Sequence, residues 1–345
     1  MKRLVTLLLV LSILFIACSE DDDDDGYDFT TDIFALFTNP NGSENVQSEA
    51  VNYIQNAEKT IAVATFLLED DDIENSLIDA HERGILVRVV CDQENYAIDE
   101  EGCYGRLEDG GIEISVDPRG GSSSHNKTMI IDSSIVWTGC TNFTYSGLFS
   151  NNNSALIMNS REIALEYLHD FQQMFDGRFQ SNKTSNGVEE YTIDGSAVQV
   201  YFTPVDGVEN MLRERVQMAE ESIDLAIYAY TLNYITDDYI DAHNRGVEIR
   251  VIFDSLAIER GYNTKYNDFV RAGIDARKDP CRYAFHHKFM IIDGDELIVS
   301  SGNYTMSGTN YNDENFVWIQ DGDIIDYYTQ EFEKWWQETE SYNLK

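Results

Sequence analysis

The stretch Ala80-His-Glu-Arg-Gly-Ile-Leu-Val-Arg-Val-Val-Cys-Asp92 recurs as Ala242-His-Asn-Arg-Gly-Val-Glu-Ile-Arg-Val-Ile-Phe-Asp254, with seven of thirteen positions identical. The two copies are 162 residues apart, and residues 111–118 match residues 273–280 at the same separation. Similarity that persists at one fixed separation is the mark of an internal duplication. We therefore expect two copies of one structural unit in this chain.

Each copy alternates amphipathic helices with apolar, Val/Ile-rich strands. In the first copy the expected elements, in the order helix, strand, helix, strand, are residues 46–57, 61–68, 73–83 and 85–91. In the second copy the same order is expected at residues 208–220, 223–230, 235–245 and 247–253. This alternation predicts an α/β fold in which a mostly parallel mixed sheet is covered by helices on both faces.

Composition and repetition divide the chain into five segments. We predict a signal peptide (1–17), an acidic tether (18–30), a first α/β unit (31–180), a polar linker (181–195) and a second α/β unit (196–345). The linker is placed where polar residues and Gly breaks separate the two copies.

The N-terminus has the features of a targeting segment. Lys2 and Arg3 precede an apolar stretch (4–17) that is too short to span a bilayer as a helix. Cys18 follows Ile-Ala, which resembles a bacterial lipobox, and this resemblance implies cleavage before Cys18 and lipidation of its sulfur. The acidic run 21–25 resembles the export signal of bacterial surface lipoproteins. We expect a lipid-anchored protein of the bacterial outer membrane, and of the cell surface if the acidic run acts as that signal.

The composition is strongly acidic. Only 24 Lys and Arg residues stand against 62 Asp and Glu, which gives a net charge of −38. Such a charge favours a soluble monomer. It disfavours long nucleic acid as a partner, because binding a polynucleotide requires Lys and Arg to displace counterions.

No metal site or cofactor is predicted from the cysteines, which show no CxxC motif and no zinc-ligand spacing. Four cysteines follow Cys18, namely Cys91, Cys103, Cys140 and Cys281. Any of three full disulfide pairings remains open for them, and free buried thiols are equally compatible with the sequence.

A second repeated pattern carries the chemistry. Both copies read His-x-Lys, four residues, Asp, and then Asn ten residues after the Asp. The residues are His125, Lys127, Asp132 and Asn142 in the first copy, and His286, Lys288, Asp293 and Asn303 in the second. His and Lys two positions apart on a strand point to the same face, roughly 6.5 to 7 Å apart, which suits one phosphoryl group. Two such sets supply a nucleophile, a proton donor, and cationic and amide groups for the phosphate oxygens.

This pattern resembles the HKD signature of the phospholipase D superfamily, and the resemblance covers nearly the whole mature chain. It implies two phospholipase D-like α/β/α sandwich units with a single active site at their interface. It also implies a phosphodiesterase that works through a covalent phosphohistidine, without metal or cofactor. Asp132 and Asp293 are structural in this scheme. Cys140 stands where the family usually has Ser.

The resemblance also implies that the two histidines are unequal. The family commonly has an acidic residue after each trailing Asn, which orients the histidine of the opposite motif. Glu314 stands eleven residues after Asn303, whereas the corresponding residue of the first copy is the neutral Asn153. Glu314 is therefore expected to pair with His125 as the nucleophile, leaving His286 as the general acid. The alternative is that Glu314 is an ordinary surface carboxylate.

The substrate is less strongly specified. The motif surroundings resemble the nuclease and cardiolipin-hydrolase branch of the superfamily, whose members cleave nucleic acid, phospholipid or both. The acidic composition and the expected lipid anchor favour phospholipase D-type hydrolysis of phospholipid to phosphatidate. A metal-independent endonuclease is the alternative, and a non-catalytic surface binding module is a more distant one. The endonuclease alternative rests on four cations that flank the motifs, Arg119, Arg277, Lys278 and Arg282.

Overall fold

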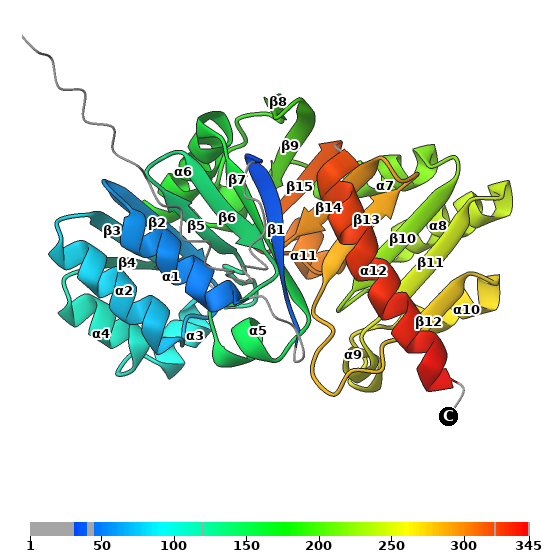
Figure 1. Ribbon diagram of the computed structural model, residues 1–345, viewed down its shortest axis with the longest axis horizontal. Coiled ribbons are helices and arrows are strands. Elements are labelled where there is room, and N and C mark those ends of the chain that lie inside the picture. The colour runs from blue at the N-terminus through cyan, green and yellow to red at the C-terminus, as the bar shows by residue number, and fades with distance from the viewer. Residues whose placement is uncertain (1–30, 40–44, 119, 321, 344–345) are drawn as a thin grey trace, which may run out of the picture. The chain divides into compact units, whose positions relative to one another are not determined.

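Two mixed β-sheets, one from each repeat, organise the chain (Figure 1). The computed structural model describes residues 31–39, 45–118, 120–320 and 322–343. The predicted signal peptide, the lipidation site Cys18 and the acidic tether lie outside the described residues. Among the helices that are described, none is long and apolar enough to cross a membrane.

The two sheets repeat one topology. The first sheet has, in spatial order, β1 (Ile33–Thr38), β7 (Asn153–Asn159), β6 (Ile135–Gly139), β5 (Lys127–Ile131), β2 (Thr60–Thr65), β3 (Leu86–Cys91) and β4 (Glu113–Val116). The second sheet has β12 (Asp275–Lys278), β11 (Glu248–Phe253), β10 (Ser222–Ile227), β13 (Lys288–Ile292), β14 (Glu296–Ser300), β15 (Asn315–Gln320), β9 (Ser196–Phe202) and β8 (Glu190–Ile193). The duplicated α/β architecture predicted from the repeat is thus confirmed.

The prediction of a mostly parallel sheet needs correction. Only β2–β3–β4 and β10–β11–β12 are parallel, and the remaining pairs in both sheets are antiparallel. The residues used for the prediction form the parallel part. The strands that follow each His-x-Lys motif return through connections such as residues 132–134, which are too short for a helical crossover, so these strands pair antiparallel.

Part of the predicted linker is also structured. Residues 190–193 form β8, which pairs with β9 through the turn Asp194-Gly195. Both turn residues have positive φ, 50° and 88°, which is the geometry that an Asp-Gly hairpin turn favours. This segment therefore extends the second sheet.

Helices cover both faces of each sheet, as expected for an α/β/α sandwich. In the first repeat they are α1 (Val46–Asn56), α2 (Asp71–Glu82), α3 (Gln93–Ile98), α4 (Cys103–Asp109), α5 (Tyr145–Phe149) and α6 (Arg161–Phe175). In the second they are α7 (Val208–Met218), α8 (Asn233–Arg245), α9 (Ser255–Glu259), α10 (Tyr266–Ala272), α11 (Met306–Asn310) and α12 (Gly322–Asn343). Helices α1 and α2 pack on the outer core of the first sheet, and α7 and α8 on that of the second.

The third hydrophobic core joins the two repeats. It contains apolar residues from both sheets together with residues of α6 and α12, among them Phe171 and Phe332. Helix α6 also contacts β9 of the other repeat, and α12 contacts β1. Burial of apolar surface between the sheets therefore holds the repeats together as one unit.

A buried polar network fixes how the repeats meet. The Asn315 side chain of the second repeat accepts hydrogen bonds from Thr138 Oγ1 (2.6 Å) and the Tyr167 hydroxyl (3.0 Å). It donates to Asn126 Oδ1 (2.9 Å) and Thr128 Oγ1 (3.3 Å), all in the first repeat. Because all four hydrogen-bonding positions of this buried amide are filled, a shift of one repeat against the other would leave polar groups unpaired.

The four cysteines of the described region are free thiols in the structure. Cys91, Cys103 and Cys140 are buried, and Cys281 is partly buried. Of the two alternatives left open by the sequence, the structure shows free thiols.

The motif aspartates stabilise a turn. Asp132 accepts hydrogen bonds from the backbone N–H groups of Glu58, Lys59 and Thr60, at 2.8, 2.6 and 2.9 Å. Asp293 makes the same three bonds to the equivalent residues of the second repeat, at 2.9, 2.7 and 2.8 Å. Asp132 thereby ties the turn that follows β5 to the start of the neighbouring strand β2. Asp293 ties the turn that follows β13 to the start of β10 in the same way.

We predict that Asp132→Ala lowers the free energy of unfolding by roughly 2 to 4 kcal/mol, because three backbone donors lose a charged acceptor. Asp132→Asn should lose less, since Asn tolerates the φ of 51° and keeps one acceptor oxygen. Urea unfolding monitored by tryptophan fluorescence measures both values. The turnover of the folded fraction should not change, and lost turnover at unchanged stability would contradict the structural role.

Candidate active site

Each His-x-Lys motif lies where a central strand begins. Lys127 is the first residue of β5 and pairs with Thr65 at the end of β2, while Lys288 begins β13 and pairs with Ile227 at the end of β10. The histidines precede the strands by two residues. Strand geometry therefore brings His and Lys of each motif to the carboxyl edge of the parallel strands.

Backbone hydrogen bonds between the repeats place the histidines. The His125 N–H donates to the carbonyl of Asp313 in the other repeat (2.9 Å). The His286 N–H donates to the carbonyl of Asn152 in a matching way (2.8 Å). The first motif therefore lies against the segment that leads into β15, and the second lies against the segment that leads into β7. The two motifs meet across one junction between the repeats.

The histidine side chains reach residues of the opposite repeat. His125 Nδ1 lies 2.9 Å from Glu314 Oε2, and His286 Nδ1 lies 2.7 Å from Asn153 Oδ1. The Asn153 amide donates its Nδ2 to the Gly147 carbonyl (2.8 Å), so its oxygen faces His286 and accepts from an Nδ1–H. Glu314 is fully buried, which excludes the alternative of a surface carboxylate.

The two lysines are fully buried and make different contacts. Lys127 Nζ donates to the backbone carbonyl of its own His125 (2.5 Å). Lys288 Nζ donates to the carbonyl of His286 (2.9 Å) and also lies 3.1 Å from His286 Nε2. Within the described residues His125 Nε2 has no hydrogen-bond partner, whereas His286 Nε2 is occupied by Lys288.

The electrostatics of the four basic groups follow from their burial and proximity. Burial lowers the pKa of Lys127 to about 7, partly opposed by Glu314, and lowers the pKa of Lys288 to about 8. Burial also lowers the pKa of His125, again opposed by Glu314. The pKa of His286 is lowered further, because burial is reinforced by both lysines and by His125. His286 thus has the lower pKa of the two histidines.

Glu314 remains ionised in this site. Burial acts to raise its pKa, but His125 and Lys127 outweigh burial and lower it. Ser301 Oγ also donates a hydrogen bond to Glu314 Oε2 (2.7 Å). In the first repeat, Cys140 occupies the position of Ser301. Both side chains accept a backbone N–H, Cys140 Sγ from Ser154 (3.1 Å) and Ser301 Oγ from Asn315 (3.0 Å).

The two trailing asparagines lie after β6 and β14, at the same edge as the motifs. The side-chain oxygens of Asn142 and Asn303 are buried, and neither has a hydrogen-bond partner in the part of the chain that the structure describes. The structure therefore does not join them directly to the histidines or lysines. Their proposed contact is with the substrate.

Two aromatic residues of the site are not among those predicted from the sequence. The Phe66 ring lies 4.5 Å from the His125 ring, and Tyr228 lies 4.8 Å from His286, between ring centroids. The ammonium of Lys127 is 5.1 Å from the Phe66 ring, and that of Lys288 is 5.3 Å from the Tyr228 ring. Both aromatic residues directly follow equivalent strands. The sequence signal that could have identified them is that an aromatic residue recurs at the same separation of 162 positions as the rest of the duplication.

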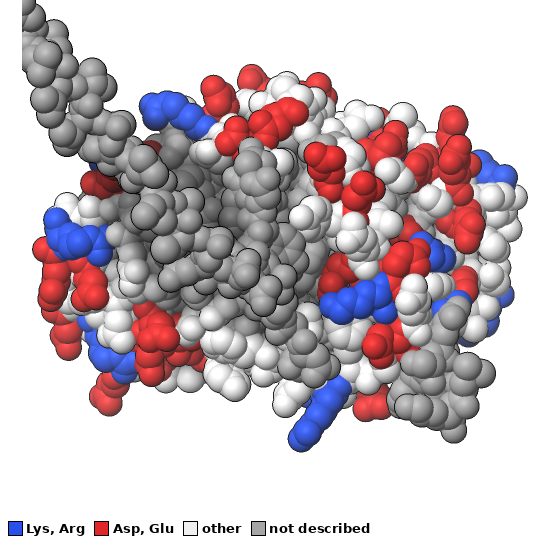
Figure 2. All heavy atoms as spheres, in the orientation of Figure 1, with Lys and Arg blue, Asp and Glu red and all other residues white. Residues whose placement is uncertain are grey.

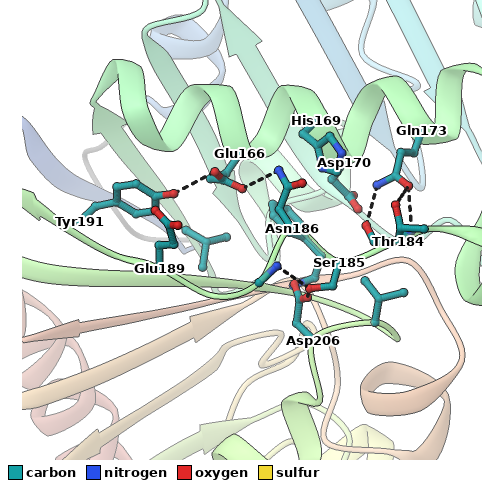
Figure 3. Close-up of a pocket in the computed structure, with 14 residues that line it drawn as sticks. Glu166, His169, Asp170, Gln173, Thr184, Ser185, Asn186, Glu189, Tyr191 and Asp206 are labelled. Carbon is teal, nitrogen blue, oxygen red and sulfur yellow. Dashed lines mark hydrogen bonds between the residues drawn. The ribbon is translucent and has the colours of Figure 1, made fainter.

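A separate pocket lies under α6 and has no chemistry of this kind (Figure 3). Its acidic and amide side chains are hydrogen-bonded to groups of the same pocket. Glu166 accepts from the Tyr191 hydroxyl (2.8 Å), and Gln173 accepts from the Thr184 N–H (2.7 Å). No group of three or more His, Cys, Asp or Glu residues in the described ranges could hold a metal ion. This pocket joins α6 to residues 184–191 structurally.

Comparison with known proteins identifies the family. The family described as "Cardiolipin synthase, PLD-like domain" matches residues 50–175 and again residues 212–336. Each match contains one complete His-x-Lys motif with its Asp and Asn. The duplication inferred from the sequence is therefore a duplication of this domain.

Individual relatives match about one repeat of this chain. Phospholipase D of Rickettsia prowazekii (strain Madrid E) is 31% identical over 150 residues, which cover 44% of this chain and 73% of that protein. Mitochondrial cardiolipin hydrolase of Chlamydomonas reinhardtii is 34% identical over 119 residues, 34% of this chain and 52% of that protein.

A solved structure shows the same two-repeat fold. The phosphatidylserine synthase of Haemophilus influenzae Rd KW20 superposes with a TM-score of 0.68 at 12% identity, covering 89% of this chain and 86% of that one. The paired motifs, their meeting across the junction of the repeats and the two domain matches lead to one conclusion: this chain belongs to the phospholipase D-like family.

Proposed function

We propose that this phosphodiesterase hydrolyses phospholipids in the manner of a phospholipase D, releasing the head-group alcohol and leaving phosphatidate. The observation that carries the proposal is the convergence of two buried His-x-Lys sets whose histidines have unequal partners, Glu314 and Asn153. Phosphodiester hydrolysis is supported by relatives named phospholipase D and cardiolipin hydrolase. The phospholipid substrate and the individual residue roles are the proposal.

The first step forms a covalent intermediate. The His125 Nε2 lone pair attacks phosphorus and forms a P–N bond, while the bond from phosphorus to the head-group oxygen breaks on the opposite side. His286 gives a proton to that oxygen. The negative charge of the bound phosphodiester raises the pKa of nearby His286, so that this proton is taken up with the substrate.

The second step removes the phosphatidyl group. Neutral His286 accepts a proton from a water molecule, which attacks phosphorus as the P–N bond breaks and His125 is restored. Lys127 and Lys288 stabilise the charge on the phosphoryl oxygens throughout, together with the amides of Asn142 and Asn303.

The contacts of the two histidines support His125 as the nucleophile. Its Nε2 has no partner in the described chain, so the lone pair is available for attack. Its Nδ1 faces Glu314, which stabilises the positive charge that develops on the imidazole as the P–N bond forms. The corresponding partner of His286 is the neutral Asn153.

Charge and kinship support phospholipid over nucleic acid. The net charge is −38, and acidic side chains are spread over the face drawn in Figure 2. Of the four flanking cations, Arg277 is turned away, because it pairs with Asp275 (2.8 Å) and stacks on Trp336. Arg119 lies outside the described residues. Relatives named phospholipase D and cardiolipin hydrolase extend the same preference to this chain.

Assay of the purified protein on phosphatidylcholine, cardiolipin, single-stranded DNA and duplex DNA tests the substrate class. We expect phosphatidate from phospholipid and no DNA cleavage. His125→Ala is the matched control and should be inactive on every substrate, because it lacks the nucleophile. Cleavage of DNA with no phosphatidate from either lipid would replace the proposal with the nuclease alternative.

A pair of variants tests the nucleophile. With a p-nitrophenyl phosphodiester, whose leaving group needs no proton, His286→Ala should form the phosphohistidine and then stall, because no base activates water. The adduct should be found on His125 by peptide mass spectrometry after an alkaline quench. His125→Ala should carry no adduct, and an adduct on His286 in that variant would reverse the two roles.

We predict that the two lysines set the alkaline limb of the pH profile of kcat/KM. Their lowered pKa values, about 7 for Lys127 and about 8 for Lys288, mean that the ammonium groups are lost as the pH rises through this range. Since kcat/KM reports the free enzyme, it should begin to fall above about pH 7, where Lys127 loses its proton, rather than near the ordinary lysine value. The alkaline limb of kcat should lie higher, because bound phosphate stabilises both ammonium groups.

Glu314→Gln provides the matched comparison for this profile. Glu314 opposes the lowering of the Lys127 pKa, so its neutralisation should move the alkaline limb of kcat/KM to lower pH. A profile that stays flat to pH 10 in the unmodified protein would show that neither lysine titrates as described.

A further inference from the structure

The two repeats present different surfaces to the substrate. We name the basic rim four residues of the second repeat that lie at or after the carboxyl ends of β10, β11 and β12, namely Tyr228 and the cations Arg260, Lys278 and Arg282. At the equivalent positions the first repeat has uncharged residues, Phe66, Ile98, Val116 and Gly120. At these four positions the second repeat therefore has three cations and the first repeat has none.

Strand register places the basic rim on the active-site edge of the sheet. Lys288 pairs with Ile227, Ile227 with Phe253, and Phe253 with Lys278. These residues form one row across β13, β10, β11 and β12. At about 4.8 Å for each strand spacing, Lys278 lies roughly 14 Å from Lys288 along this row.

Arg260 joins the rim to the catalytic histidine. The positive charge of Arg260 acts on the Tyr228 hydroxyl, where it opposes the burial that raises the pKa of Tyr228, and the Tyr228 ring lies against His286 with 4.8 Å between centroids. Arg260 is exposed, so its donors face solvent. This cation beside the ring that covers His286 has no charged counterpart in the first repeat, where residue 98 is an isoleucine that is 85% exposed.

The rim cations lack acidic partners. In the described part of the chain no ion pair involves Arg260, Lys278 or Arg282, although acidic residues outnumber basic ones 62 to 24 overall. Instead Lys278 lies over the Tyr266 ring (5.1 Å) and Arg282 over the Tyr283 ring (5.8 Å).

The acids nearest the rim are held by backbone N–H groups rather than by the rim cations. The buried carboxylates of Asp254 and Asp279 accept backbone N–H groups, from Phe285 and Cys281 among others. Of the exposed segment 255–263, Glu259 is the acidic residue beside Arg260, whereas the equivalent segment 93–101 of the first repeat carries four acids and no base. An anionic group is thus repelled on one side of the site and attracted on the other.

We propose that the basic rim binds an anionic group on the leaving arm of the substrate. The direction rests on the proposed function: with His125 as nucleophile, in-line displacement places the leaving oxygen beside His286, and hence beside the basic rim. The preferred substrates are therefore phospholipids whose head group carries a second anionic group, such as a phosphate. The diacylglycerol arm then lies on the side of the first repeat, near Phe66 and Ile98.

The test uses two lipids that differ in one group. Short-chain phosphatidylglycerol and phosphatidylglycerol phosphate are compared below their critical micelle concentrations, so that adsorption to a lipid surface does not enter. The ratio of kcat/KM for the phosphorylated over the plain lipid should be well above one. In Arg260→Ile, which copies the first repeat, the ratio should fall about tenfold, mainly through the KM of the phosphorylated lipid.

Two further variants separate charge from structure. Arg260→Lys should keep most of the preference, because a cation remains at the rim. Arg271→Ile is the control for loss of a surface arginine: its side chain is 72% exposed at the end of α10, near the start of β12 and away from the site. It should leave both the activity and the ratio unchanged.

The outcomes are distinct. A ratio at or below one in the unmodified protein would overturn the inference, as would an equal loss on both lipids in Arg260→Ile, which a structural role through Tyr228 would cause. Hydrolysis of neither lipid, with cleavage of a single-stranded oligonucleotide, would instead overturn the proposed function itself.

Discussion

The reciprocal backbone contact between the repeats is the constraint on which the site depends. The N–H of His125 and the N–H of His286 are each held by a carbonyl of the other repeat. Neither repeat can complete the site alone, because the partner of each imidazole, Glu314 or Asn153, also lies across the junction. The shared apolar core and the fully bonded Asn315 amide fix this junction to one geometry.

Holding these groups in place requires burying several charges. Two lysines with no exposed surface would be expensive to keep charged in isolation, and their lowered pKa values reflect this. Glu314 compensates part of that charge and remains ionised itself. The remaining compensation is the anionic substrate, so the site is electrostatically complete when a phosphodiester is bound. Under the proposed function, the acidic exterior and the cationic interior together favour small or membrane-borne phosphodiesters over long polyanions.

Much of this could be predicted from the sequence, because the duplication offers two independent readings of each feature. The motif residues were predicted from spacing that recurs in both copies, whereas the structural role of Asp132 and the contact of Glu314 with His125 were implied by the family resemblance. The antiparallel half of each sheet was missed, since buried Val/Ile runs do not reveal strand direction. The orientation of Arg277 could not be predicted from the sequence either, because it is set by Trp336, which lies far along the chain in α12. Phe66 and Tyr228 were not predicted as site residues, because their contacts with the imidazoles of His125 and His286 arise only in the folded structure.

The paired differences between the repeats have a consequence for the gene. Glu314 with Ser301 in one copy corresponds to Asn153 with Cys140 in the other, and Glu314 and Asn153 each contact the histidine of the opposite copy. A protein assembled from two first repeats would contain two asparagines and no carboxylate, and one assembled from two second repeats would contain two carboxylates. Gene conversion between the two halves would therefore remove the difference between the partners of the two histidines. Selection should keep the halves diverged at these four codons even where the surrounding scaffold remains similar.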